Sequence, residues 1–258
     1  MRNLIKNIIN FLPYEIKFFR MICKPLMILF RQIERPFYLK IKNLNFKLYP
    51  SKSLHQTGIA LYPRIIEKKM LATINKNVKH KGIFIDLGSH SGFYALKIYQ
   101  DLKKISKSYA FEIDPFSIKI IKENIKINNL SKFIKIIDQA VSGHKLSYTF
   151  VPNLKNRGSS FIKINTRKSA KKTITLSGWF NKRINKKIAA IKMDIEGQEY
   201  EVLKDLFKNI KKKFLPDVIV IEINPSFKNS KKIKNFLSKN NYVLNGKESL
   251  NFAFIRNS

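Results

Sequence analysis

The stretch GIFIDLGSHSGFYALKIY, residues 82–99, decides how the chain folds. Apolar residues lead into Asp86, the glycines Gly88 and Gly92 follow four residues apart, and the remainder has the composition of a helix. Glycine lets a backbone turn sharply and approach a ligand without a Cβ in the way. A strand, a tight turn and a helix in this order are typical of a nucleotide-binding unit.

Strands and helices alternate from this stretch to the C-terminus, which indicates an α/β domain with a mostly parallel sheet and right-handed crossovers. The runs KLSYTFVP and SSFIKIN interrupt the alternation around residues 145–165, and we interpret them as a β-insertion. The closing runs NYVLNG and LNFAFIR indicate an antiparallel pair at one sheet edge. We expect helices over residues 62–79, 91–103, 116–128, 198–211 and 228–240.

Residues 1–54 form a basic, apolar extension, and we assign residues 55–258 to the α/β domain. We expect short helices interrupted at Pro13, Pro25 and Pro36, followed by a strand-like run. The tightest apolar run is far shorter than the roughly 20 residues of a membrane span. The extension either packs on the core as a lid or lies on a membrane surface, because it is both apolar and basic.

A single cysteine, Cys23, excludes a disulfide framework and a thiolate zinc site, so we expect a cytoplasmic protein. The formal net charge is +34, from 51 Lys and Arg against 17 Asp and Glu. Such a field attracts polyanions such as nucleic acid, anionic lipid or acidic glycan. Thirteen of the acids lie between Asp86 and Glu222, whereas residues 139–192 hold thirteen cations and no acid.

The loop after the first strand matches neither G-x-x-x-x-G-K-[ST] nor G-x-G-x-x-G, so no phosphate-binding loop is indicated. A carboxylate such as Asp86 at the strand end repels a pyrophosphate and favours a cationic ligand. Glu112, 24 residues after Gly88, has the position of an acid that accepts hydrogen bonds from ribose hydroxyls. S-adenosyl-L-methionine combines a ribose with a positive charge; a Rossmann-like domain for another nucleotide is the alternative.

The segments FIDLGSHSGFYAL, AFEIDPFSIKIIKENIKINN, QAVS, IKMDIEGQEYEVLKDL and VIVIEINP occur in the order found in FkbM-type methyltransferases. The chain resembles this family from about Glu67 to its C-terminus. The resemblance implies a class I methyltransferase fold, Rossmann-like and seven-stranded, and S-adenosyl-L-methionine as cofactor. It also implies O-methylation of a sugar or natural product. His90 and Ser177 depart from the Asn and Asp that the family usually has there.

The resemblance also implies which residues contact the cofactor. The candidates are Asp86, Gly88, His90, Gly92, Glu112 and Asp138. Glu112 is expected on the ribose, and Asp138, after the third strand, near the adenine amine. His90 contacts the ligand or, alternatively, caps the helix that follows it.

The motif K-x-D-x-E-G after the fourth strand carries the catalytic candidates. Asp194 is the expected base or hydroxyl-orienting residue, Glu196 supports it, and Lys192 offsets the local negative charge. Two alternatives stay open: a hard metal ion held by Asp194, Glu196 and Glu222, or purely structural hydrogen bonds. A favourable helix dipole by itself explains Glu199.

The expected function is therefore O-methylation of a hydroxyl group, on a sugar or on a surface glycan or glycolipid that is anionic. An RNA methyltransferase is the alternative, in which the basic segment 139–193 holds nucleic acid. The aromatic residues interleaved there would stack on bases: Tyr148, Phe150, Phe161, Trp179 and Phe180.

Overall fold

A computed structural model describes residues 7, 17–165, 171–184 and 186–257. The chain divides into two compact units, Met1–Ile66 with Pro152–Ser160 and Glu67–Val151 with Phe161–Ser258. The first unit continues past the boundary expected at residue 54. Apart from residue 7, the extension before residue 17 lies outside the described residues, and so does the interruption expected at Pro13.

From residue 17 onward, the first unit contains a helix, a hairpin and a short second helix. Its elements are α2 (Lys17–Gln32), β1 (Phe37–Ile41), β2 (Leu44–Leu48), the 3-10 turn η1 (Pro50–Lys52) and α3 (Leu54–Leu61). Pro25 lies inside α2, so the expected helix break at Pro25 is wrong. A proline in a helix interior removes one backbone donor, but α2 continues through Pro25 to Gln32. The buried rings of Phe30 and Phe37 pack edge to face, with centroids 5.5 Å apart, and join α2 to the hairpin.

The second unit is built on a seven-stranded sheet. Its strands are β3 (Gly82–Leu87), β4 (Ile105–Phe111), β5 (Ile134–Ile137), β11 (Ile188–Met193), β12 (Val218–Glu222), β13 (Tyr242–Glu248) and β14 (Asn251–Arg256). The spatial order is β13-β14-β12-β11-β3-β4-β5. Neighbours from β5 to β12 pair parallel, and β14 pairs antiparallel with both β12 and β13. The predicted sheet and its antiparallel edge pair are confirmed.

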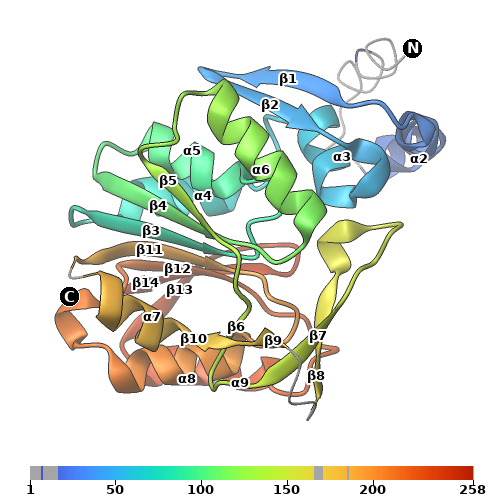
Figure 1. The fold of residues 1–258 in the computed structure, drawn as a ribbon. Helices are drawn as coiled ribbons and strands as arrows, with labels where there is room; N and C mark the ends of the chain where they lie inside the picture. The colour runs from blue at the N-terminus through green and yellow to red at the C-terminus, as the bar shows by residue number, and fades with distance from the viewer. Residues whose placement is uncertain (1–6, 8–16, 166–170, 185, 258) are drawn as a thin grey trace. The chain divides into compact units, whose positions relative to one another are not determined.

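Helices cover both faces of this sheet (Figure 1). They are α4 (Lys68–Asn77), α5 (Phe93–Asp101), α6 (Pro115–Ile127), α7 (Leu176–Arg183), α8 (Glu199–Asn209) and α9 (Ser230–Lys239). One face carries α4, α5 and α6, and the other carries α7, α8 and α9. Every residue of β3 and β11 is buried, as expected for central parallel strands rich in isoleucine. Asp114 caps α6 by accepting a hydrogen bond from the Phe116 N–H, ahead of Pro115 at the first helical position.

The β-insertion expected around residues 145–165 is also confirmed. It comprises β7 (Ser147–Val151), β8 (Phe161–Asn165) and β9 (Lys171–Lys172), with β7 in the middle of a small antiparallel sheet. A short parallel pair, β6 (Val141–Ser142) and β10 (Ile174–Thr175), brackets the insertion. The chain then enters α7 and returns to the amino end of β11.

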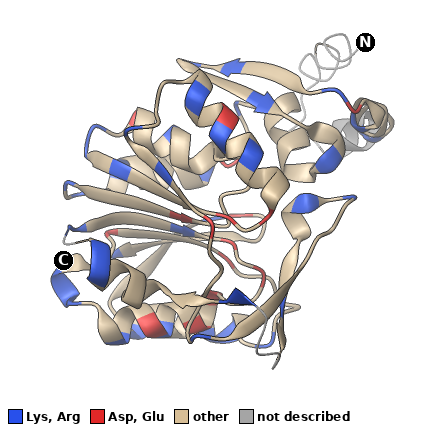
Figure 2. Ribbon diagram, in the orientation of Figure 1, with Lys and Arg blue, Asp and Glu red and all other residues tan. Residues whose placement is uncertain are grey.

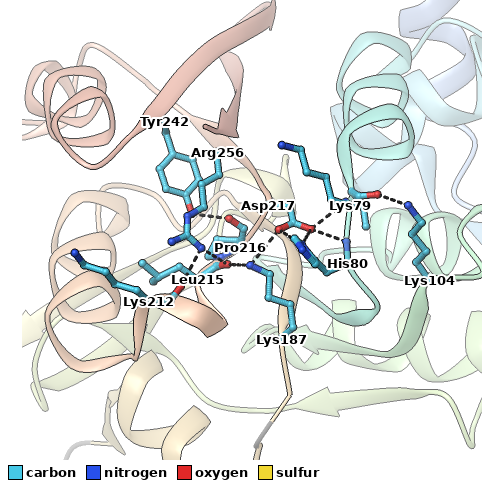
Figure 3. A network of polar contacts seen from close by, with 11 residues as sticks. Lys79, His80, Lys104, Lys187, Lys212, Leu215, Pro216, Asp217, Tyr242 and Arg256 are labelled. Carbon is cyan, nitrogen blue, oxygen red and sulfur yellow. Dashed lines mark hydrogen bonds and ion pairs between the residues drawn. The ribbon is translucent and has the colours of Figure 1, made fainter. Parts of the chain in front are cut away.

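Asp217, next to the amino end of β12, joins three central strands at that edge of the sheet (Figure 3). Its buried carboxylate accepts hydrogen bonds from the backbone N–H groups of Lys79, at 3.0 Å, and His80, at 2.9 Å. The Nζ of Lys187, at the start of β11, lies 3.0 Å away. Burial opposes ionisation, but His80 and Lys187 outweigh it and lower the pKa of Asp217. Tyr242 adds β13 to this edge by donating a hydrogen bond to the Pro216 carbonyl.

We expect Asp217→Ala to lower the free energy of unfolding by about 3 kcal/mol at neutral pH, because it leaves the Lys187 ammonium and two amide donors without their acceptor. Urea denaturation measures this change. The pKa of Asp217 in the folded protein is depressed below its ordinary 3.8. The stabilisation that Asp217 gives the folded state is therefore present above pH 3.8 and is lost as the pH falls through the pKa of the folded protein. The difference between variant and wild type should therefore shrink in acid.

Glu34→Ala is the matched control, because it also removes a carboxylate from an ion pair. The Glu34 side chain is 77% exposed and lies 2.8 Å from Lys52 Nζ, so water replaces the lost contact. Its unfolding curve should match that of the wild type. Equal losses in the two variants would show that Asp217 has no special structural role.

Candidate active site

Acidic residues gather at the edge of the sheet where the parallel strands end (Figure 2). Asp86 lies near the end of β3, Glu112 directly follows β4, Asp194 directly follows β11, and Glu222 ends β12. The tertiary structure therefore brings together residues that lie up to 136 positions apart in the sequence, from Asp86 to Glu222 (222 − 86). The carboxyl ends of parallel strands are where ligands bind in open α/β sheets.

Lys192 is the cation of this cluster, and it is 6% exposed. Its Nζ lies 3.0 Å from Asp194 Oδ2, and Lys192 pairs in register with Asp86 on the neighbouring strand. Burial by itself would lower the pKa of Lys192, but the charges of Asp194, Asp86 and Glu67 raise it above its ordinary value. Lys192 therefore stays charged and compensates the carboxylates around it.

Asp86 is buried beneath the loop that follows β3. Its Oδ2 accepts hydrogen bonds from Ser89 Oγ, at 2.6 Å, and from the Ala95 N–H, at 3.2 Å. Its Oδ1 is buried and has no hydrogen-bond partner among the described residues. Burial raises the pKa of Asp86, and Lys192 opposes that rise. A buried carboxylate oxygen without a donor is costly, so this atom fits a ligand that brings a donor or a positive charge, as S-adenosyl-L-methionine does.

Gly88 and Gly92 both have positive φ, 76° and 78°. A Cβ on Gly88 would lie 1.9 Å from the carbonyl oxygen of Asp194. A Cβ on Gly92 would lie 2.9 Å from Leu96 Cδ1 and 3.2 Å from Ile121 Cγ2. Gly88 thus lets the β3 and β11 loops touch, and Gly92 lets α5 pack on α6. These packing roles accompany the predicted cofactor contacts, which stay predictions.

Glu112 anchors the loop after β3 through backbone amides. Its Oε2 accepts a hydrogen bond from the His90 N–H at 2.8 Å, and its Oε1 accepts from the N–H groups of Ile113 and Asp114. Burial raises the pKa of Glu112, and these three amides oppose the rise. Each carboxylate oxygen has more than one acceptor site, so a ribose contact from Glu112 remains compatible with these bonds.

His90 adopts φ 52°, a region that Asn and His enter more readily than most residues. This requirement explains why His can replace the Asn that the family usually has at this position. The His90 ring lies against α6, with Nδ1 3.2 Å from Ser117 Oγ. Asp138 follows β5 and is exposed. Burial raises the pKa of Tyr148, and the negative charge of Asp138 raises it further. Its predicted adenine contact stays a prediction.

Three carboxylates form the centre of the cluster. Oxygen atoms of Asp194, Glu196 and Glu222 all lie within 4.8 Å of one another. Burial first, and then the charge of Asp194, raise the pKa of Glu196 to about 7 and that of Glu222 to about 8. Such a trio can share protons at neutral pH, and its oxygens also suit a hard cation such as magnesium.

The loop that carries Glu196 is held by Glu199. Glu196 adopts φ 52°, which is uncommon for a residue with a side chain. Glu199 is buried at the start of α8, where its Oε1 accepts from the Ile195 N–H at 2.8 Å and its Oε2 from the Gly197 N–H at 3.0 Å. The helix dipole and these two hydrogen bonds account for Glu199, which holds the loop of the catalytic candidates.

Three residues beside the carboxylate cluster were not predicted from the sequence: Glu67, Tyr94 and Asn251. The Tyr94 hydroxyl donates to Glu67 Oε2 at 2.7 Å, and the Tyr94 ring centroid lies 5.7 Å from Lys192 Nζ. Asn251 of β14 donates to Glu67 Oε1 at 3.2 Å, and burial raises the pKa of Glu67. One signal existed in the sequence: Glu67 is the only acid between Glu34 and Asp86.

Ser177 lies outside the carboxylate cluster. Its backbone N–H and its Oγ donate to the two oxygens of Asp205, at 2.9 and 2.6 Å, and so join α7 to α8. The departure from the family pattern at this position is therefore a matter of helix packing. A carboxylate at position 177 would lack the hydroxyl donor that Ser177 Oγ supplies to Asp205.

Comparison with known proteins matches residues 86–244 to the methyltransferase FkbM domain. A ribosomal protein L11 methyltransferase of Carboxydothermus hydrogenoformans is 36% identical over 69 residues, which cover 27% of this chain and 22% of that protein. The uncharacterized protein MJ1452 of Methanocaldococcus jannaschii is 38% identical over 77 residues, covering 30% and 27%. The matches span about a quarter of the length of these curated relatives.

Among solved structures, a putative rRNA-methylase from Clostridium thermocellum has a TM-score of 0.47 at 11% identity, covering 74% of this chain and 94% of that one. TYW2 of M. jannaschii in complex with AdoMet has a TM-score of 0.43 at 17% identity, covering 87% and 88%. Likeness at this level bears on neither substrate nor mechanism.

The FkbM match covers more than half of the chain, 159 of 258 residues counted from 86 to 244. It begins at Asp86 and includes the loop of Gly88 and Gly92 and the loop after β11 that carries the catalytic candidates. The chain therefore belongs to the FkbM family of S-adenosyl-L-methionine-dependent methyltransferases.

Proposed function

We propose that this methyltransferase acts on a hydroxyl group, of a sugar or of a surface glycan or glycolipid. The observation that carries the proposal is Asp194, paired with Lys192 and flanked by Glu196 and Glu222 where β11 and β12 end. A hydroxyl that gains a methyl group loses a proton, and a carboxylate within reach can accept it or orient the oxygen.

S-adenosyl-L-methionine, when bound, supplies a methyl group activated by its sulfonium. Asp194 orients the acceptor hydroxyl and takes its proton late in the reaction. The buried Lys192 ammonium lies 3.0 Å from Asp194 Oδ2 and offsets its negative charge. Glu222, with its pKa near 8, retains a proton at neutral pH, which favours negative charge on Asp194 over Glu222. Alignment of the hydroxyl accounts for most of the acceleration.

The structure supports the RNA alternative less well. Three of the five aromatic side chains expected to stack on bases are buried: Tyr148, Trp179 and Phe180. Trp179 packs edge to face on both Tyr109 and Phe111, with centroids 4.9 Å apart in each case. A side chain that is buried in the core and packed on two other rings cannot also stack on a base.

Cations of the basic segment 139–193 lie at both ends of the sheet. Lys187 pairs with Asp217 at the amino end of β11, and Lys192 compensates carboxylates at the other end. Lys171 and Lys172 of β9 are exposed, and an anionic acceptor would suit them.

Radiolabelled methyl transfer onto separated polysaccharide, lipid and RNA fractions of the source cell tests the proposal. Label should enter the polysaccharide or glycolipid fraction as an ether. Labelling of the RNA fraction alone would overturn the proposal in favour of the alternative.

We expect Glu112→Gln to weaken S-adenosyl-L-methionine affinity by about tenfold or more. Glutamine keeps the shape of the side chain but loses the charge that strengthens hydrogen bonds from ribose hydroxyls, each worth about 1.5–3 kcal/mol. Titration calorimetry measures the affinity, and Glu201→Gln, on α8, is the control. Equal affinities in the two variants would remove Glu112 from the cofactor site.

We expect Asp194→Asn to lower kcat about a hundredfold, or about 2.7 kcal/mol, while cofactor affinity stays near that of the wild type. Asparagine preserves the shape of the side chain and cannot accept the proton. Single-turnover assays on the labelled fraction measure the rate. Unchanged turnover in a folded Asp194→Asn protein would make the residue merely structural.

We expect Glu222→Gln to remove a pH dependence of stability. The pKa of Glu222 is raised from 4.5 to about 8. The contribution of Glu222 to the free energy of unfolding is therefore fully present below pH 4.5 and is lost as the pH rises toward 8. Between pH 4.5 and 8, the free energy of unfolding of Glu222→Gln should rise by about 1 kcal/mol relative to that of the wild type. This figure allows for solvent screening of a half-buried group. Thermal unfolding at several pH values measures the gain.

The control variant Glu201→Gln should follow the wild-type pH dependence. Parallel curves for Glu222→Gln and the wild type would contradict the expectation. Stabilisation of the wild type by added magnesium, lost in Glu222→Gln, would instead assign the three carboxylates to a metal ion.

A further inference from the structure

The first unit exposes several large aliphatic side chains. Ile28 and Leu29 of α2 are 61% and 40% exposed, Leu54 at the start of α3 is 52% exposed, and Leu154 is 66% exposed. Meanwhile Phe30 on the same helix is fully buried, so α2 packs one side and leaves apolar residues on another. Single apolar residues on a surface are ordinary, but a cluster of them marks a site of interaction.

Hydrogen bonds place these residues in one neighbourhood. Arg31 Nη2, one helical turn after Ile28, donates to the carbonyl of Lys155 at 2.9 Å. The Leu54 N–H donates to Asn156 Oδ1 at 3.0 Å. The loop that carries Leu154 is therefore bonded both to α2 and to the first residue of α3.

We call this surface the α2 face. It comprises Lys24, Ile28, Leu29, Leu54, Leu154 and Lys155. Its two lysines are exposed, and Lys24 precedes Ile28 by one helical turn. The α2 face thus combines four exposed aliphatic side chains with two exposed lysines.

The charge around the α2 face is almost wholly positive. Residues 17–66 hold ten Lys and Arg and residues 152–160 hold two more, twelve in all. The one acid in these ranges is Glu34, which lies 2.8 Å from Lys52 Nζ. The α2 face therefore complements a partner that is negatively charged and apolar beneath the charge.

We propose that the α2 face docks on an anionic lipid bilayer. Aliphatic side chains enter the boundary between headgroups and acyl chains, and lysines and arginines pair with anionic headgroups. None of the described helices is long and apolar enough to cross a membrane. A nucleic acid would match the cations but leave the aliphatic side chains in water. The inference does not depend on which hydroxyl the enzyme methylates.

Site-specific labelling tests the docking directly. Cys23 is the only cysteine, so a Cys23→Ser background accepts one new label position at a time. Ile28→Cys reports on the α2 face, and Val243→Cys on β13, 47% exposed in the wild type, is the control. Each full-length protein carries an environment-sensitive fluorophore and is mixed with vesicles of equal parts phosphatidylcholine and phosphatidylglycerol. We expect a blue shift, and quenching by nitroxide-labelled lipid, at position 28 and not at position 243.

A second experiment separates docking from general attraction, because a net charge of +34 draws any face toward an anionic surface. In 1 M salt the Debye length is about 3 Å, so binding that persists depends on apolar contact. We expect Ile28→Ser/Leu29→Ser to reduce vesicle co-sedimentation about tenfold under these conditions. The control Val243→Ser/Leu244→Ser removes aliphatic side chains of similar exposure from the second unit and should bind like the wild type.

Unchanged cofactor affinity in both double variants shows that they are folded. Equal responses of the labels at positions 28 and 243, or equal sedimentation of the two double variants, would overturn the proposal. Equal binding to vesicles of phosphatidylcholine alone would refute the role of anionic lipid. A label at position 28 that responds to RNA and not to vesicles would assign the α2 face to nucleic acid instead.

Discussion

A buried ammonium holds the active site together. Lys192 lies between the carboxylates that end two neighbouring central strands, within 3.0 Å of Asp194 and in register with Asp86. Several carboxylates buried in one place would repel one another or take up protons. The Lys192 ammonium pairs with Asp194, whereas burial and like charge move the pKa values of Glu196 and Glu222 toward neutrality. A buried ion pair is weak evidence of stability, so its value here lies in the chemistry it permits.

The two ends of the sheet use carboxylates in opposite ways. At the amino end, Asp217 receives donors from the turn before β3 and from Lys187, and its pKa falls. At the carboxyl end, burial outweighs the donors available to Asp86, whose pKa rises and whose Oδ1 has no partner among the residues described. A carboxylate with all its hydrogen-bond partners, such as Asp217, stabilises the fold. A buried carboxylate oxygen without a donor, such as Asp86 Oδ1, gains a hydrogen bond or an ion pair only when a ligand binds.

Close contact between loops keeps this site compact. The Asp194 carbonyl occupies the space that a side chain on residue 88 would need, so the loops after β3 and β11 touch. Glu112 holds the first of these loops through the His90 amide, and Glu199 holds the second through the amides of Ile195 and Gly197. The loops that carry the cofactor candidates and the catalytic candidates are therefore in direct contact.

The sequence by itself determined the α/β fold, the antiparallel edge pair, the insertion and the carboxylates at the strand ends. Those features depend on periodicity, turn residues and strand ends, which are local in the chain. The tertiary structure alone decided that Glu67, Tyr94, Lys192 and Asn251 meet, because no local pattern links residues so far apart. It also decided that Trp179 belongs to the core, and that Gly88 is needed for the Asp194 carbonyl. The same type of side chain can pack in the core or contact a ligand. Which of the two it does depends on the residues that surround it in the folded protein, and these are not evident from the local sequence.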